Sequence, residues 1–123
     1  NWFEIQAKEE QDHAMLFYRY LHNNNQEVSL ESIAKPDKRF EKLNDPLEAA
    51  LEHEKYVTSR IYDMYEVALK EKDYAAQSCL KWFIDEQVEE EANASEIVEK
   101  LEMIGDNISG LFYLDGQLGA RKD

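Results

Sequence analysis

The chain has 123 residues, with 14 Lys and Arg against 27 Asp and Glu, so its formal net charge at pH 7 is −13. This length favours a single domain, and the strong negative charge disfavours nucleic acid and anionic membranes as partners and favours cations. A hydrophobic content of 43% excludes a disordered tail, no apolar run is long enough to cross a bilayer, and the single cysteine, Cys79, indicates a reducing cytoplasm.

The first half of the chain predicts one long helix and a long connection. Only four Gly and two Pro interrupt the sequence, and the segments between them are rich in good helix formers, which predicts an all-α fold. The first helix is expected over about residues 1–22, ending at the polar stretch HNNNQ. Residues 23–45 are aperiodic and contain Pro36, so they are interpreted as a crossover.

Three further helices are expected in the second half. One covers about residues 46–70 and begins at NDPLE, where Asp45 is expected to cap the helix and Pro46 suits its first position. After a turn at EKD, the next covers about residues 74–104 and ends at Gly105 as C-cap. A short helix over about residues 109–118 completes the chain.

Each long helix has an apolar stripe that polar residues interrupt. The first stripe is broken by Glu10 and His13, an E-x-x-H pair one turn apart, and the second is broken once, by Glu54. The third is broken by Gln87 and Glu90. The complete stripes are Phe3, Ala7, Glu10, His13, Phe17 and Leu21; Leu47, Ala50, Glu54, Val57, Ile61, Met64 and Ala68; and Leu80, Phe83, Gln87, Glu90, Ala94, Ile97 and Leu101.

The interruptions are expected at one depth. If the turn near Asp73 makes the second and third helices antiparallel, Glu54 lies roughly 28 Å from it and Glu90 roughly 25 Å, at about 1.5 Å per residue. The crossover is long enough for the first and second helices to run parallel, which would bring Glu10 and His13 to the same layer. Buried carboxylates need a counter-charge and the stripes contain no Lys or Arg, so a metal ion is predicted, with iron or manganese favoured over zinc.

Other interpretations of these residues remain open. An E-x-x-H pair in a Glu-rich helix is usually a solvated surface pair, and Glu54 could be a charge at the edge of a bundle. The run EQVEEE, residues 86–91, taken alone favours a solvated acidic face. The chain could then be a helical interaction module with a vestigial site, or the bundle could serve a rubrerythrin-like di-iron peroxidase.

Three segments resemble bacterial non-haem ferritins: QAKEEQDHAM at 6–15, ALEHEKYVT at 50–58 and LKWFIDEQVEEE at 80–91. The resemblance implies a ferritin-like four-helix bundle with a long crossover and a short C-terminal fifth helix. It also implies a cytoplasmic hollow shell of 24 subunits that oxidises Fe(II) with O2 or H2O2 at a non-haem di-iron centre and stores Fe(III) mineral. The second E-x-x-H of bacterioferritins is absent, because Asn93 or Ala94 stands where its His would be.

The same resemblance implies roles for individual residues. Glu10 would bridge two irons, His13 would bind the first, and Glu54 and Glu90 would bind the second, with Gln87 close by. A third iron site nearer the cavity would use Glu9, Glu86, Glu89 and Glu90.

The family's first helix would precede Asn1, because the chain begins where the second helix of the family begins. A Glu ligand of the first iron belongs to that helix. Three explanations are open: the native chain was cut or truncated, the segment belongs to a longer native chain, or another chain takes its place. If the segment is truly missing, the first iron site lacks a ligand and the ferroxidase activity should be weak.

Overall fold

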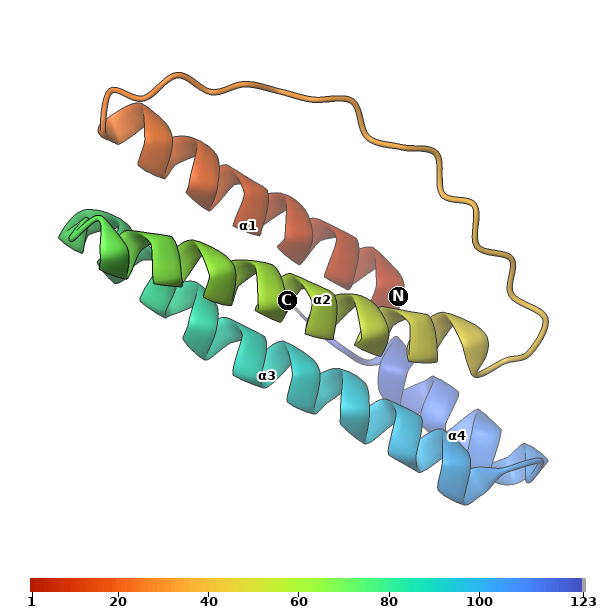
Figure 1. Ribbon diagram of the computed structural model, residues 1–123. Helices are drawn as coiled ribbons and strands as arrows, with labels where there is room; N and C mark the ends of the chain where they lie inside the picture. The colour runs from red at the N-terminus through yellow and green to blue at the C-terminus, as the bar shows by residue number, and fades with distance from the viewer. Residues whose placement is uncertain (123) are drawn as a thin grey trace. The chain divides into compact units, whose positions relative to one another are not determined.

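The computed structural model describes residues 1–122, which form four helices and contain no strand (Figure 1). They are α1 (Trp2–Asn23), α2 (Asp45–Lys70), α3 (Tyr74–Ile104) and α4 (Ile108–Gly119). Each helix begins and ends within one residue of its expected range. The prediction of an all-α fold is confirmed.

The chain divides into two compact units. The terminal unit comprises Asn1–Asp37 and Asp106–Asp123, and the hairpin unit comprises Lys38–Gly105. The expectation that residues 1–123 form one domain stays a prediction.

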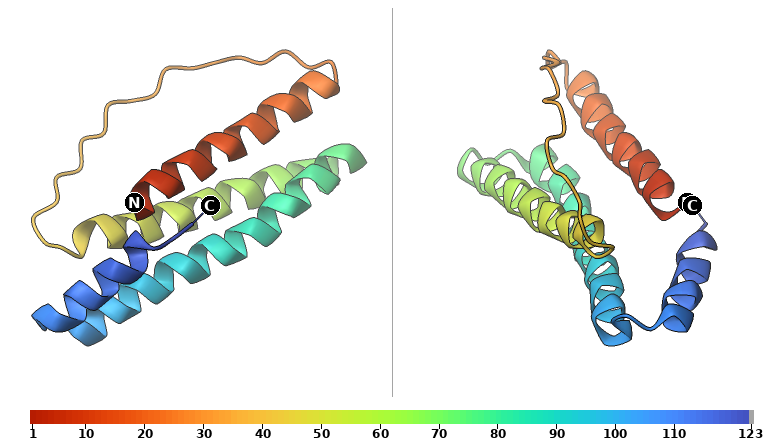
Figure 2. Two further views of the ribbon diagram at one scale, coloured as in Figure 1. Left: turned by 180° about the vertical axis from the view of Figure 1, so that it is seen from behind. Right: turned by 90° about the vertical axis from the view of Figure 1, so that its right-hand side faces the viewer.

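In the hairpin unit, α2 and α3 lie side by side and run antiparallel (Figures 1 and 2). Between them Lys72 adopts a left-handed φ of 55°, and the Asp73 carboxylate caps α3 by accepting the N–H of Ala76 at 2.9 Å. At the other end of α3, Gly105 has a φ of 54° and its N–H donates to the Leu101 carbonyl at 2.9 Å, as the C-cap prediction requires.

The interior of the hairpin unit follows the predicted stripes closely. All seven stripe residues of α3 are buried, and they are the complete set of buried residues on that helix. On α2, Leu47, Glu54, Ile61 and Ala68 are buried as predicted, whereas Met64 is 42% exposed. The three-and-four spacing of apolar residues therefore identifies the packed faces of these two helices.

The predicted role of Asp45 at the start of α2 is wrong. Asn44 is the N-cap residue and makes no side-chain capping bond, while Asp45 is already helical. The Asp45 carboxylate instead accepts the backbone N–H groups of Glu41 (2.8 Å) and Lys42 (2.9 Å), which precede the helix. The carboxylate therefore anchors the end of the crossover rather than the first turn of α2.

These two hydrogen bonds predict a pH-dependent anchor. The hydrogen bond from the Lys42 N–H, and to a smaller extent that from the Glu41 N–H, lowers the pKa of Asp45 below its ordinary value of 3.8. Because the folded-state pKa is the lower one, the stabilisation is present above 3.8 and is lost as the pH falls through the folded pKa. We expect Asp45→Asn to accelerate amide hydrogen exchange over residues 38–46 at neutral pH, and the difference from wild type to vanish in acid. Glu48→Gln, at an exposed position in the same turn, is the control, and a difference that persisted in acid would contradict the assignment.

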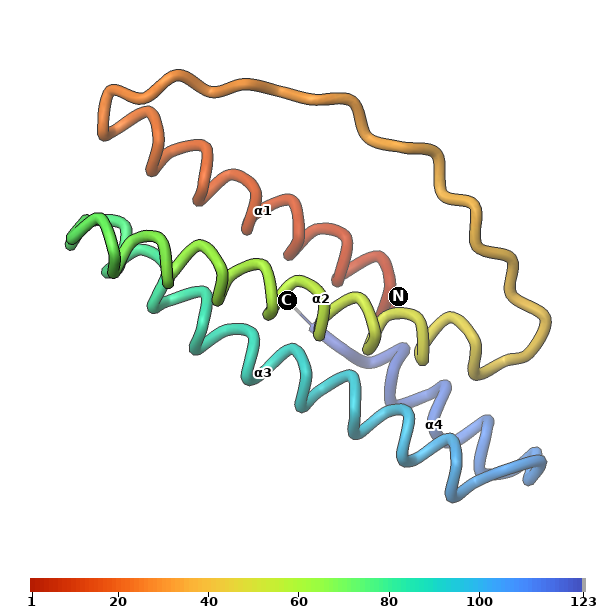
Figure 3. The backbone as a smooth tube through the Cα atoms, viewed as in Figure 1, coloured from red at the N-terminus to blue at the C-terminus, as the bar shows by residue number. Residues whose placement is uncertain are grey.

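The crossover between α1 and α2 has no regular secondary structure over residues 24–41 and is drawn as an extended trace (Figure 3). Leu30 and Ile33 within it are 84% and 97% exposed. Among residues 1–122, no helix is both long enough and apolar enough to span a membrane.

In the terminal unit, the predicted stripe on α1 is wrong in its first two turns. Phe3 is 50% exposed and Ala7 is exposed, while Trp2, Ile5 and Gln6 are buried. The reason lies partly in the residues that follow α4, because the Arg121 guanidinium lies 5.4 Å from the centre of the Trp2 ring.

Candidate metal centre

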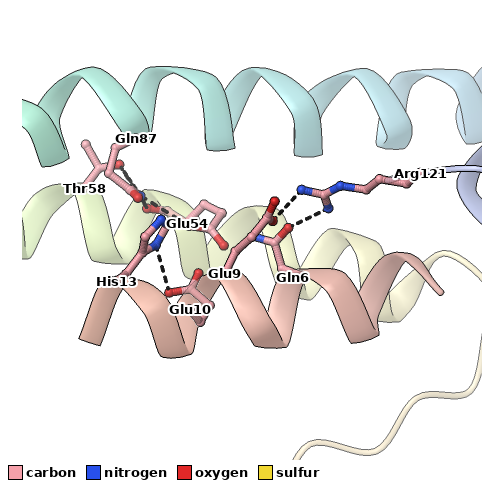
Figure 4. Close-up of polar contacts among 8 residues, drawn as sticks. All are labelled: Gln6, Glu9, Glu10, His13, Glu54, Thr58, Gln87 and Arg121. Atoms are coloured by element: carbon pink, nitrogen blue, oxygen red, sulfur yellow. Dashed lines mark hydrogen bonds and ion pairs between the residues drawn. The ribbon is translucent and has the colours of Figure 1, made fainter. Parts of the chain in front are cut away.

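The hairpin unit contains a buried polar layer between its two helices. Glu54, Gln87 and Glu90 are only 4%, 4% and 6% exposed. The Gln87 amide nitrogen lies 3.3 Å from Glu54 Oε2 and 3.1 Å from the Glu54 carbonyl oxygen, and donates to both (Figure 4). Glu54 of α2 and Gln87 of α3 are therefore in direct contact. The helix rise predicted one level for Glu54 and Glu90, and that pairing stays a prediction.

Thr58 connects this layer to a further carboxylate. Its Oγ1 lies 2.6 Å from Glu91 Oε1 and 3.0 Å from the Glu54 carbonyl oxygen, and it accepts from the Gln87 amide at 3.2 Å. A hydroxyl has one proton to donate. Thr58 therefore donates either to Glu91 or to the Glu54 carbonyl oxygen while it accepts from the Gln87 amide. Thr58 and Glu91 were not among the residues predicted from the sequence; the available signal was their spacing, one turn beyond Glu54 and Gln87 respectively.

A pocket in the hairpin unit borders this layer. The pocket is lined by Thr58, Tyr62, Gln87, Val88 and Glu91. Gln87 therefore belongs both to the pocket and to the buried layer.

Two of the predicted ligands on α1, Glu10 and His13, lie on one face of the helix. His13 Nδ1 is 3.6 Å from Glu10 Oε2, and their side chains are 15% and 40% exposed, respectively (Figure 4). This separation is too long for a strong hydrogen bond. A carboxylate and an imidazole one turn apart can both bind a metal ion, and the burial of His13 argues against a purely solvated pair.

The predicted ligand Glu9 already has a cationic partner within the terminal unit. Arg121 donates from Nη2 to Glu9 Oε2 at 2.5 Å and from Nη1 to Gln6 Oε1 at 2.9 Å. Gln6 and Arg121 were not predicted from the sequence, because nothing in a local pattern relates residues that are more than a hundred positions apart.

The predicted ligand set is thus divided between the two units. Glu9, Glu10 and His13 belong to the terminal unit, and Glu54, Glu86, Gln87, Glu89 and Glu90 belong to the hairpin unit. Glu86 is half-buried and Glu89 is exposed.

The donor chemistry fits iron. The set consists of carboxylates, one amide and one imidazole, which suits hard cations such as iron and manganese. No Lys or Arg is buried among residues 1–122. Cys79 is outside the set, and partial burial raises the pKa of its thiol, which keeps it protonated and a poor ligand.

Comparison with known proteins identifies the family. The ferritin-like domain of the ferritin family matches residues 1–104. This chain belongs to the ferritin family. It is 37% identical over 121 residues to the bacterial non-heme ferritin of Staphylococcus haemolyticus strain JCSC1435, a match that spans 98% of this chain and 73% of that ferritin. It is 36% identical to the bacterial non-heme ferritin of Staphylococcus aureus strain USA300 over the same shares of the two chains.

Solved structures of ferritins are similar to this chain. An open pore ferritin from the hyperthermophilic archaeon Archaeoglobus fulgidus matches with a TM-score of 0.97 and 38% identity, over 99% of this chain and 75% of that ferritin. A humanized archaeal ferritin matches with a TM-score of 0.96 and 41% identity, over 99% of this chain and 74% of the other. The prediction of an all-α, ferritin-like bundle is confirmed.

Proposed function

We propose that this protein stores iron in the bacterial cytoplasm, oxidising Fe(II) at a di-iron ferroxidase centre and keeping the Fe(III) as mineral inside a hollow shell of 24 identical subunits. Its membership of the ferritin family supports iron storage. The observation that carries the ferroxidase proposal is the buried pair Glu54 and Glu90, which shares the interior of the hairpin unit with Gln87. Burying carboxylates costs free energy, and a bound cation offsets that cost.

The proposed ligands come from both units. Glu10 bridges the two irons, His13 binds the first, and Glu54 and Glu90 bind the second, with the Gln87 amide beside Glu54. A third site, which receives iron on its way to the mineral, uses Glu9, Glu86, Glu89 and Glu90. These roles extend to this chain the pattern implied by its resemblance to non-haem ferritins.

The residues support the oxidation in two ways. The net charge of −13 attracts Fe(II) to the protein, and anionic ligands favour Fe(III) over Fe(II), which lowers the cost of electron loss. Two bound Fe(II) ions each lose one electron, and O2 gains both electrons and two protons to become H2O2. Hydrogen peroxide can itself accept two electrons from a further pair of Fe(II) ions and, with two protons, become water.

The test pairs the two ligands on α1. We expect Glu10→Ala combined with His13→Ala to slow aerobic Fe(II) oxidation by about tenfold to 100-fold or more. Losing residues that only hold metal ligands in place typically costs about tenfold to 100-fold. Stopped-flow absorbance of Fe(III) measures the rate. His22→Ala combined with Glu27→Ala, at exposed positions, is the matched control.

The same preparations test storage and assembly. Size-exclusion chromatography with light scattering, after aerobic iron loading, should give one iron-bearing peak of the mass expected for 24 copies of the native chain. Unchanged oxidation in the α1 double variant would refute the di-iron centre, and an iron-free peak at the mass of a single chain would refute storage in a shell.

A further inference from the structure

The residues that follow α4 return to α1 and bind it through Arg121. The guanidinium donates to Gln6 and to Glu9 (Figure 4), and it also lies over the ring of Trp2. All four residues belong to the terminal unit. One cationic side chain therefore contacts a neutral amide, an aromatic face and a carboxylate at the same time.

This contact differs from an ordinary surface ion pair. The side chains of Arg121 and Glu9 are 21% and 32% exposed, whereas those of Arg60 and Asp63, an ion pair on α2, are 58% and 66% exposed. Gln6 and Trp2, which complete the surroundings of Arg121, are 9% and 8% exposed. Such a partly buried, charge-assisted contact holds its groups more firmly than an exposed pair does.

A second set of bonds fixes the backbone on which Arg121 stands. The Asn1 side-chain amide donates to the carbonyl oxygens of Leu118 (3.3 Å), Gly119 (3.0 Å) and Arg121 (3.0 Å). The end of α4 is thus attached to the start of α1 independently of the Arg121 side chain. Loss of the Glu9 contact alone would leave the backbone attachment in place.

We propose that Arg121 is a latch on Glu9: it holds the carboxylate in the metal-free protein and yields it when a divalent cation binds there. The inference rests on the proposed function, in which Glu9 is a ligand of the third iron site. A guanidinium and a metal ion are both positive, so they compete for one carboxylate. Arg121 is a positioning residue in this account and does not itself touch the iron.

The contacts of Arg121 keep the affinity of the Glu9 site for a cation low. When a cation takes Glu9, Arg121 still has Gln6 and Trp2 as partners, so it remains close by and can recover the carboxylate. Binding of the cation is therefore opposed by a nearby positive charge, and its departure is assisted. A weak site of this kind passes iron onward instead of retaining it.

The test compares Mn(II) binding in wild type, Arg121→Gln, Glu9→Gln and the double variant by titration calorimetry. Mn(II) suits oxygen ligands and is stable in air. The latch predicts that Arg121→Gln strengthens the Glu9-dependent binding step about three- to tenfold at low ionic strength, and that salt reduces this gain. The gain should be absent when Glu9 is also replaced. Arg60→Gln removes the same charge at an exposed site and should leave Mn(II) binding unchanged.

Thermal unfolding of the metal-free variants separates the latch from a merely structural contact. A lowered Tm in Arg121→Gln with unchanged Mn(II) affinity, while Glu9→Gln weakens binding, would overturn the latch and leave Glu9 as an iron ligand. If Glu9→Gln leaves Mn(II) binding unchanged, both the latch and the proposed role of Glu9 are wrong. Arg121→Lys keeps the charge but cannot bond Gln6 and Glu9 as a fork, so its affinity should lie between those of wild type and Arg121→Gln. It also provides the comparison if Arg121→Gln does not fold.

Discussion

Replacing Glu54 with Gln should slow aerobic Fe(II) oxidation by about 100-fold or more, the upper end of what weakened support of a metal site costs, because it removes an anionic ligand outright. Glu54 is the least exposed of the predicted carboxylate ligands, at 4%. The substitution keeps the size of the side chain and its carbonyl-type oxygen. The Gln87 amide can therefore still find an acceptor where Glu54 Oε2 now lies.

The stability of the metal-free protein should respond in the opposite sense. A buried carboxylate carries a desolvation cost that a neutral amide avoids, so the metal-free Glu54→Gln protein should be at least as stable as wild type. Iron binding should raise the Tm of wild type more than that of the variant, since a ligand stabilises only the state that binds it. Stopped-flow oxidation rates and thermal unfolding with and without Fe(II) under anaerobic conditions measure the two effects.

The matched control is Glu66→Gln, which removes the same charge from an exposed position on the same helix. It should leave both the oxidation rate and the shift of Tm with iron close to wild type. A wild-type rate in Glu54→Gln would mean that the buried carboxylate of α2 takes no part in the oxidation. Equal losses would mean that net charge, and not a ligand, controls the rate.

The sequence predicted α3 more fully than any other element, and the reason is physical. Its stripe of Leu80, Phe83, Ala94, Ile97 and Leu101 is regular enough that the two polar interruptions, Gln87 and Glu90, had to share the buried face. The depths of Glu54 and Glu90 then followed from the turn at residues 71–73 and the rise of a helix. The bond between Gln87 and Glu54 places one of the two interruptions against α2, while the shared level of Glu54 and Glu90 stays a prediction.

The start of α1 could not be predicted in the same way. The opening residues WFEIQAKEE place apolar groups on two adjacent faces, so periodicity alone did not choose between Phe3 and Trp2. A contact with a residue distant in the sequence contributes to the choice, because Arg121 lies over Trp2. Glu9 likewise appeared only as a possible metal ligand, and its pairing with Arg121 depends on a contact that no local pattern encodes.

Asp45 and Thr58 illustrate a further limit. Asp45 has the right spacing to cap α2, but its carboxylate can accept from backbone N–H groups on either side of it. In the structure it accepts from those that precede it, at Glu41 and Lys42. Thr58 lies beside the apolar stripe of α2, and a threonine there is unremarkable until Glu91 and Gln87 are found against its hydroxyl. Side-chain hydrogen bonds between helices depend on the final packing, which residue spacing does not contain.

Replacing Phe83 with Ala should cost about 3–5 kcal/mol of unfolding free energy, the loss typical of removing a buried aromatic side chain. Phe83 is 3% exposed and packs edge-on against Trp82, with ring centres 4.9 Å apart. It stands one turn before Gln87 on the same buried face. Its removal leaves a cavity next to the polar layer as well as a loss of apolar burial.

Urea unfolding of the metal-free protein, at one fixed protein concentration, measures the effect, because assembly would otherwise shift the apparent stability. Val88→Ala on the same helix is the control: Val88 is 64% exposed, so its loss should be within about 0.5 kcal/mol. Similar losses for the two variants would show that the face of α3 carrying Gln87 and Glu90 is not the packed one. The ligands of the hairpin unit would then lack the rigid apolar support on which their placement depends, and the iron centre proposed for them would fail with it.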